Sequence, residues 1–264
     1  MGSLGGHGGG GDATGATRTC VLEEKALQIL QGADGAGAAL RLIGGIAIWV
    51  RTPSSVRSMF DRHYADLDFV GRRSQGKMLS HILGEAGYIP EARFNAIHGE
   101  RRLIFAEVSG GLQIDIFLDR FEMSHKLDFR KRLEVEPLTV PGAELLLSKL
   151  QIAEVNEKDI VDIAMLTAGH QLGKVDGPAT INVTHVAALC SSDWGLHTTA
   201  SDNISRTRAL APDLVADRGL VEDVVEKMTE LQAALDAAPK TAGWKLRARA
   251  GRRIRWYEIP DEVS

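Results

Sequence analysis

The sequence predicts an α/β protein: a mixed sheet with flanking helices, followed by an all-α C-terminal region. Up to about residue 142, short apolar runs of strand length alternate with segments of helical spacing, whereas from residue 143 the apolar residues recur at helical spacing. Gly-Gly pairs at residues 44–45 and 110–111 punctuate the front half. At 264 residues, the chain is long enough for one large or two modest domains.

Changes in composition divide the chain into four segments. Residues 1–18 consist mostly of glycine and small polar residues, which bury too little surface to offset their ordering entropy, and we expect them to be disordered. A phosphate-binding glycine loop is the alternative, but no apolar strand precedes these glycines and no Gly-Lys-Ser/Thr follows. Residues 19–142 are expected to form the α/β domain, residues 143–240 a helical domain, and residues 241–264 a basic C-terminal segment.

The front half is predicted to contain its helices and strands in a regular succession. The expected elements are a helix over residues 19–33, a strand over 40–43, a helix over 46–50, a polar loop over 51–62, a strand over 66–70, a helix over 74–86, a hairpin with strands over 92–97 and 101–108, a strand over 112–118 and an edge strand over 133–140. Glycines at positions 35, 37 and 87 end the two longer helices, because glycine readily takes the backbone conformation that follows a helix.

The back half is predicted to be helical up to its basic end. The expected helices span residues 145–155, 159–166, 183–190, 204–216 and 219–237. The C-terminal run WKLRARAGRRIRWYEIP interleaves arginines with aromatic residues, a combination that can grip single-stranded nucleic acid. Its small and apolar residues alternate with the basic ones, which favours instead a strand or helix with one charged face.

Composition excludes several classes of protein. The net charge is −4, so there is no global basic field, and a nucleic-acid partner would need a local patch. The two cysteines lie far apart and give no zinc or disulfide pattern, which fits a reducing compartment. No apolar run approaches the roughly 18 residues of a membrane span, and the first residues do not resemble a secretory signal. We therefore expect a cytoplasmic protein with no membrane partner.

Three aspartates stand at strand positions. Asp66 and Asp68 lie two residues apart in a predicted strand, so their side chains leave the same face, while Leu67 and Phe69 point into a core. Asp115 takes the equivalent position in a second run, LQIDIFL. If the two strands are neighbours, the three carboxylates converge on one spot.

Converging carboxylates raise one another's pKa and destabilise the fold unless a cation compensates them. Magnesium removes this cost, because it prefers oxygen ligands, usually one or two carboxylates together with substrate phosphates. Two such ions about 3.5–4 Å apart can activate an attacking hydroxyl and stabilise a leaving oxygen. We therefore expect Asp66, Asp68 and Asp115 to hold two Mg²⁺ ions, with Mn²⁺ as the alternative. The competing interpretation is that Asp-x-Asp belongs to a turn or a helix cap.

A glycine pair and two basic residues could bind the phosphates. Gly44 and Gly45 follow a predicted strand and open a predicted helix, where glycine permits close approach to a phosphate and the helix N-terminus offers N–H donors. The alternative is a plain tight turn. Arg51 follows in a basic loop, and Lys149 lies at the edge of an apolar helix face. Either side chain could reach a triphosphate, or could instead be solvated on the surface.

These residues together resemble the motif of the polymerase-β-like nucleotidyltransferase superfamily. The matching stretches are LIGGIAIW, ADLDF and QIDIF. A further stretch, ELLLSKLQIAEVNEKDIVDI, is similar to the segment that follows the catalytic domain in abortive-infection toxins and related uncharacterised nucleotidyltransferases. The resemblance covers about residues 38–168. The glycine surroundings depart from the usual pattern, because Ile-Ala-Ile-Trp follows the glycines and the first arginine is Arg51.

The resemblance implies a catalytic domain over residues 19–142 that transfers a nucleoside monophosphate from a nucleoside triphosphate, ATP among the candidates, to an acceptor hydroxyl. It implies that Asp66 and Asp68 hold both metal ions, that Asp115 holds the catalytic ion and helps to deprotonate the acceptor, and that Gly44 and Gly45 hold the triphosphate. The acceptor is left open as a small molecule, a protein or an RNA end. The alternative is a non-catalytic member that binds nucleotide or a partner protein, such as a toxin with its cognate antitoxin.

Overall fold

The computed structural model describes residues 12–108 and 110–259. At its centre lies a five-stranded sheet in the order β1-β2-β5-β4-β3, in which β2 and β5 run parallel and the other neighbours run antiparallel. The sheet is therefore mixed, as the sequence predicts. Its strands are β1 (Leu40–Ile43), β2 (Asp66–Gly71), β3 (Tyr88–Pro90), β4 (Arg102–Glu107) and β5 (Gln113–Leu118).

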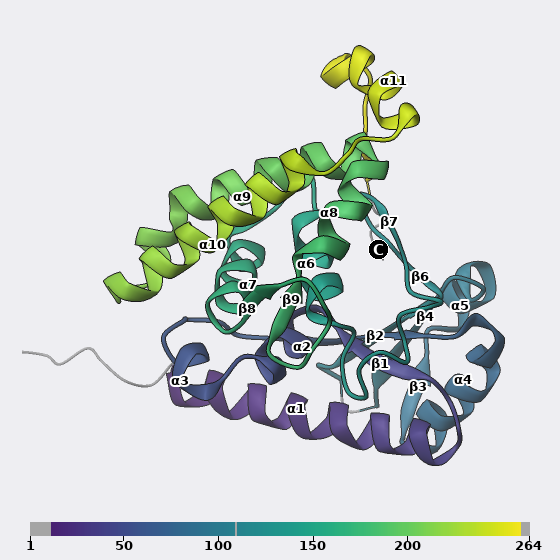
Figure 1. The fold of residues 1–264 in the computed structure, drawn as a ribbon. Coiled ribbons are helices and arrows are strands. Elements are labelled where there is room, and N and C mark those ends of the chain that lie inside the picture. The colour runs from purple at the N-terminus through teal and green to yellow at the C-terminus, as the bar shows by residue number, and fades with distance from the viewer. Residues whose placement is uncertain (1–11, 109, 260–264) are drawn as a thin grey trace, which may run out of the picture.

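Helix α1 (Asp12–Gly35) runs along one side of the sheet, at the bottom of Figure 1. Its apolar residues recur every three or four positions, which gives a single face for packing, and the buried ones include Leu22, Ala26, Ile29 and Ala33. The other elements of the front half are α2 (Gly44–Arg51), α3 (Ser54–Arg57), the 3-10 helix η1 (Arg73–Gln75), α4 (Gly76–Glu85) and α5 (Ala92–His98).

The second half of the chain packs as a group of helices above α2 in Figure 1. The helices are α6 (Gly142–Leu150), α7 (Glu157–Ala168), α8 (Val183–Ser192), α9 (Trp194–Leu214) and α10 (Arg218–Ala237). Side chains of Asn156, Asn182, Asp193 and Asp217 accept backbone N–H bonds at four of the helix starts, as N-cap residues do. Every apolar side chain of α6 is buried, because this helix lies between the sheet side and the outer helices.

Two short sheets lie outside the central one. One pairs β6 (Arg120–Glu122) with β7 (Lys126–Asp128), and the other pairs β8 (Gln171–Gly173) with β9 (Thr180–Asn182). The β8–β9 pair interrupts the helices of the second half, so the prediction that this half is all-α is correct only for its main elements. Within the described residues, no helix is long and apolar enough to cross a membrane.

The predicted hairpin over residues 92–108 is wrong in its first arm. Ala92–His98 forms helix α5, and β4 pairs instead with β3. The cause is a side chain that takes the place of a neighbouring strand: Asn95 Nδ2 donates to the carbonyl of Ile104 at 2.9 Å, and Asn95 Oδ1 accepts from the Ile104 N–H at 2.8 Å. Both the N–H and the carbonyl of Ile104 are thus bonded to the Asn95 amide, and the carbonyl also accepts from the N–H of Glu91 at 2.9 Å.

The predicted edge strand over residues 133–140 is not a strand. Only its end reaches β1, where Leu42 donates to the carbonyl of Leu138 at 3.1 Å and accepts from the N–H of Val140 at 2.9 Å. These two bonds leave a single isolated bridge between Leu42 and Thr139. The alternation of apolar residues reflects separate burial of Leu133 and Val140, with turns between them.

The disordered tail predicted over residues 1–18 is wrong for its last part, because α1 already begins at Asp12. The remainder of that prediction, residues 1–11, lies outside the described residues.

The C-terminal run, for which the sequence left a strand or a helix open, is helical. Helix α11 (Ala242–Ala250) and the 3-10 helix η2 (Gly251–Arg253) occupy it, and Thr241 caps α11. Its arginines stack on aromatic rings of the same chain, Arg247 on Trp194 and Arg255 on Tyr257, at 4.7 and 5.0 Å from the ring centres.

Candidate active site

Strands β2 and β5 bring the three predicted carboxylates to one region of the sheet. The strands lie side by side in parallel, and their register pairs Asp68 with Asp115 and Asp66 with Gln113. The intervening side chains point to the opposite face, where Leu67 and Ile114 are fully buried. The alternation of apolar and acidic residues therefore holds the carboxylates on one face by burying their neighbours on the other.

Of the three carboxylates, Asp68 has the pKa that its surroundings raise. Burial raises the pKa of Asp68 well above its ordinary value, and the nearby Asp66 and Asp115 carboxylates raise it further, while Lys149 and Arg102 act in the opposite direction. The Asp115 carboxylate, in contrast, has two hydrogen-bond donors beside it. It accepts a hydrogen bond from Arg102 Nε at 2.8 Å and another from Gln113 Nε2 at 2.8 Å. Asp68 is therefore the carboxylate that gains most from a cation.

A closed metal cage is not formed by these residues. In residues 12–108 and 110–259, no group of three or more His, Cys, Asp or Glu side chains is arranged to hold a metal ion. The third carboxylate, Asp115, already forms an ion pair with the guanidinium of Arg102. The donor chemistry of Asp66 and Asp68 nevertheless fits magnesium, which commonly takes one or two carboxylates and completes its shell with phosphate oxygens and water.

Gly44 lies directly against Asp68 at the start of α2. Its φ of +75° is a left-handed value that favours glycine, and a Cβ atom there would stand 2.3 Å from Asp68 Oδ2. The preceding residue, Ile43, has no side chain that could cap the helix. The N-terminal end of α2 therefore lies beside the Asp68 carboxylate, and negative charge near a helix N-terminus is favourable.

At Gly45, a neighbouring aromatic ring leaves no space for a side chain. A Cβ atom on Gly45 would stand 2.4 Å from Tyr64 Cε1. Tyr64 is buried, and its hydroxyl donates to Asp162 Oδ1 at 3.2 Å. Close packing of an aromatic ring thus accounts for Gly45, and the prediction that it holds a triphosphate is not needed to explain it.

Arg51 is not brought to the carboxylates. It lies at the opposite end of α2 from Gly44, where its Nη1 donates to Thr139 Oγ1 at 3.1 Å and its Nη2 donates to the carbonyls of Gly177 and Pro178, each at 2.9 Å. Eight residues of α-helix rise about 12 Å. Arg51 therefore fastens α2 to the β8–β9 loop, and its predicted role in triphosphate binding is not supported by its position.

Lys149 lies close enough to influence Asp68, but two other carboxylates hold it. Its Nζ is 2.8 Å from Asp159 Oδ1 and 2.9 Å from Asp162 Oδ2. Burial would lower the pKa of Lys149, but these two carboxylates outweigh burial and raise it. Lys149 is thus a charged part of the junction between α6 and α7, next to the predicted site.

No protein-family model and no curated protein match the chain. Among solved structures, it is similar to the antibiotic-resistance factor ANT(2'')-Ia, with a TM-score of 0.39 and 14% identity over 74% of this chain and 96% of that one. It is also similar to an antigenic nucleotidyltransferase-like protein from Paracoccidioides brasiliensis, with a TM-score of 0.36 and 15% identity over 85% of this chain and 94% of that one.

Two residues of the site were not predicted from the sequence. Arg102 reaches Asp115 because β4 pairs with β5 in a register that sets Arg102 opposite Phe117, two positions along from Asp115. Gln113 lies two positions before Asp115 on β5 and so shares its face, but strand alternation alone does not indicate the hydrogen bond between the two side chains. A basic residue near the start of a strand adjoining an acidic one is the signal that could have indicated Arg102.

The contact between Gly44 and Asp68 leads to a testable expectation. Gly44→Ala should destabilise the protein by about 1–3 kcal/mol, because it strains a left-handed backbone position and places a methyl group against a carboxylate. Thermal unfolding measures this loss. Gly84→Ala is the matched control, since nothing lies within 4 Å of a Cβ there. Equal unfolding temperatures for Gly44→Ala and the unsubstituted protein would contradict the close approach.

Proposed function

We propose that the chain is a metal-dependent nucleotidyltransferase that moves a nucleoside monophosphate from a nucleoside triphosphate to an acceptor hydroxyl. The observation that supports it best is the parallel register of β2 and β5, which sets Asp68 beside Asp115 with Asp66 on the same face. The neighbouring carboxylates raise the pKa of Asp68, so its charged form destabilises the fold unless a cation is bound. The N-terminus of α2 lies beside this cluster, and a helix N-terminus is a favourable position for a phosphate.

Each residue then has a defined task. Asp66 and Asp68 would hold Mg²⁺ or Mn²⁺, and the bound ions would neutralise charge on the phosphates. The absence of a side chain on Gly44 lets the start of α2 approach the Asp68 carboxylate closely, so that a phosphate held by the cations would lie near this helix end. Arg102 and Gln113 orient the Asp115 carboxylate through their hydrogen bonds.

The proposed transfer is a substitution at phosphorus. The acceptor oxygen forms a bond to the α-phosphorus of the triphosphate, and the bond from that phosphorus to the oxygen bridging the β-phosphate breaks. Pyrophosphate leaves with the electron pair. The proton of the acceptor hydroxyl passes to the Asp115 carboxylate, which lies on the same face as the pair that would hold the cations.

The test is incubation of the full chain with each labelled nucleoside triphosphate and Mg²⁺ or Mn²⁺, together with tRNA, protein and small-molecule acceptors. Pyrophosphate release and a labelled acceptor are expected, and both should disappear in Asp66→Ala/Asp68→Ala. Absence of both products in every combination, or equal product formation by the double variant, would overturn the proposal.

A second candidate function is nucleotide or partner binding without turnover, as in one component of a toxin–antitoxin pair. The observation that favours it is the ion pair between Arg102 and Asp115, which engages the third carboxylate with a residue of the protein. Calorimetry that shows nucleotide binding while pyrophosphate release stays absent would favour this candidate. A growth arrest that depends on Asp66 and Asp68 would favour the enzyme.

A further inference from the structure

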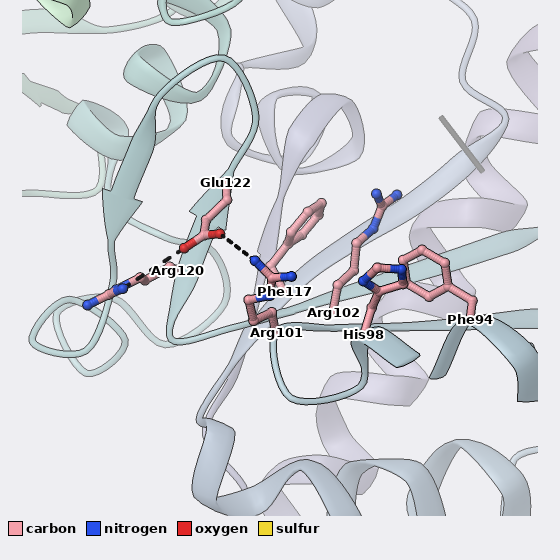
Figure 2. A pocket seen from close by; sticks show the side chains of 7 residues that line it. All are labelled: Phe94, His98, Arg101, Arg102, Phe117, Arg120 and Glu122. Carbon is pink, nitrogen blue, oxygen red and sulfur yellow. Dashed lines mark ion pairs between the residues drawn. The ribbon is translucent and has the colours of Figure 1, made fainter. Parts of the chain in front are cut away.

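A cavity lined by Arg102 of β4 and Phe117 of β5 opens on the face of the sheet that carries Asp115. Figure 2 shows the side chains that line it. Its volume is about 90 Å³, and it is open to solvent, so a ligand could place one group inside while the rest extends outward. Phe94 and His98 from α5 line one side, with their ring centres 4.7 Å apart. Phe117 from β5 lines the other. These rings give the cavity flat walls that suit a planar group.

Arg102 connects this cavity to the proposed site. Its guanidinium lines the cavity and lies 5.0 Å from the ring centre of Phe117, while its Nε donates to Asp115 at 2.8 Å. Asp115 and Phe117 are two positions apart on β5, so they share a face and are separated by about 7 Å along the strand. A molecule in the cavity therefore lies within reach of the carboxylate that would take up the acceptor proton.

The charged residues of the cavity are mostly cationic. Besides Arg102, Arg101 and Arg120 contribute guanidiniums, and Glu122 is the single acid. Glu122 lies 3.7 Å from Arg101 Nη1 and 4.0 Å from Arg120 Nη1, beyond hydrogen-bonding distance in both cases (Figure 2). Arg120 Nε also lies 3.9 Å from Asp128 Oδ2, again beyond hydrogen-bonding distance. The side chains of Arg101 and Arg120 are 66% and 49% exposed. Their donors can therefore turn to an anionic ligand, which guanidinium groups bind through paired hydrogen bonds.

We propose that this cavity binds the acceptor, and that the acceptor is a small hydroxyl compound with a planar ring and an anionic group, carboxylate or phosphate. The inference rests on the proposed function, because it assigns the acceptor side of that same site. The rings of Phe94, His98 and Phe117 would pack against the planar part, while Arg101 and Arg120 would hold the anion. A cationic acceptor would meet three guanidiniums and is disfavoured by like-charge repulsion.

Matched probes test the sign of the charge. The full chain is titrated with 4-hydroxybenzoate, 4-hydroxyphenyl phosphate and 4-hydroxybenzylamine, which share a phenol and differ in the charge that it carries. We expect both anions to bind and the amine not to bind. A stronger response to 4-hydroxyphenyl phosphate identifies phosphate as the preferred anion, and a stronger response to 4-hydroxybenzoate identifies carboxylate. Binding of 4-hydroxybenzylamine as tightly as the anions would overturn the proposal.

Variants locate the binding. Arg101→Gln/Arg120→Gln should weaken anion binding by about tenfold, since charge-assisted hydrogen bonds to the anion are lost. Arg93→Gln is the matched control, because Arg93 is exposed on α5 and does not line the cavity. Both variants keep the buried core intact, and their thermal unfolding should match that of the unsubstituted protein. Equal anion affinity in the double variant would place the anion elsewhere and overturn the inference.

Turnover separates this inference from the function on which it rests. Labelling of 4-hydroxybenzoate or 4-hydroxyphenyl phosphate that is lost in Arg101→Gln/Arg120→Gln supports both. Labelling of cationic acceptors alone would retain the transferase and overturn the anionic acceptor. Anion binding in the cavity with no pyrophosphate release from any triphosphate would overturn the transferase, and with it the role of the bound anion as an acceptor.

Discussion

Asp68→Asn is expected to lower the proposed nucleotidyl transfer by about 10³-fold or more while raising the thermal stability of the metal-free protein. Activity falls because a neutral amide binds a divalent cation poorly. Stability rises because burial and the carboxylates of Asp66 and Asp115 raise the pKa of Asp68, so the folded state holds its charge at a cost that asparagine removes. A loss of activity that comes with a gain in stability cannot be caused by unfolding, so the two measurements together separate the loss of a metal ligand from structural damage.

The gain in stability should depend on pH in a defined direction. Below the ordinary aspartate pKa of about 3.9, Asp68 is protonated in both the folded and the unfolded state, and the variant has no advantage. As the pH rises toward and through the raised pKa of the folded state, the unsubstituted protein loses stability relative to Asp68→Asn.

Thermal unfolding in EDTA across this pH range measures the difference. Asp61→Asn is the matched control, because the Asp61 side chain is 90% exposed. Added Mg²⁺ should raise the unfolding temperature of the unsubstituted protein more than that of Asp68→Asn. A variant that is less stable than the unsubstituted protein at pH 7 in EDTA would contradict the carboxylate cluster.

Lys149→Met is expected to destabilise the protein by about 3–5 kcal/mol, the largest stability effect in this region. The substitution leaves Asp162, which is fully buried, with one cationic partner fewer. Arg62 Nε at 2.8 Å and the Tyr64 hydroxyl at 3.2 Å remain, but they also depend on the position of that carboxylate. Urea unfolding measures the loss.

Two further variants give this expectation its controls. Lys158→Met should change stability by less than about 0.5 kcal/mol, because Lys158 is exposed and Asp159 pairs with Lys149 instead. Lys149→Met/Asp162→Asn should be more stable than Lys149→Met alone, since the second change removes the buried charge that lost its partner. A loss of less than 1 kcal/mol in Lys149→Met would contradict the buried network.

The same network makes the stability of the folded protein depend on pH under acidic conditions. Burial would raise the pKa of Asp162, but Lys149 and Arg62 outweigh it and lower the pKa. A lowered pKa contributes stability above the ordinary aspartate value of about 3.9, and that contribution is lost as the pH falls through the folded-state value. This acid loss should be absent from Lys149→Met/Asp162→Asn.

The face of the sheet on which each carboxylate lies could be predicted because local sequence determines it. Leu67 and Phe69 must face a core, so Asp66 and Asp68 must face away, and the same alternation governs Asp115. The glycine turn and the helix after it could also be predicted from local sequence, because the apolar residues Ile46 and Ile48 follow the glycines directly. Only the adjacency of β2 and β5 required the fold, and the short apolar runs on both strands favoured it.

The remaining assignments depended on contacts across long separations in sequence. Arg51 finds its partners at Gly177 and Pro178, and Lys149 finds Asp162 rather than a phosphate. Nothing in the neighbouring residues distinguishes such a buried ion pair from an exposed one. Asn95 misled the prediction in the same way, because a side chain that bonds Ile104 leaves no trace in apolar periodicity.

The fastening of α2 to the β8–β9 loop through Arg51 has a consequence for protein engineering. The front half carries the carboxylates, but Arg51 and Arg62 are both anchored to residues after position 142. The two halves are therefore not interchangeable modules. A chimaera that joins this sheet to the helices of another protein would need to supply acceptors for both guanidiniums, and a cut near residue 142 would leave each arginine facing a cavity or solvent.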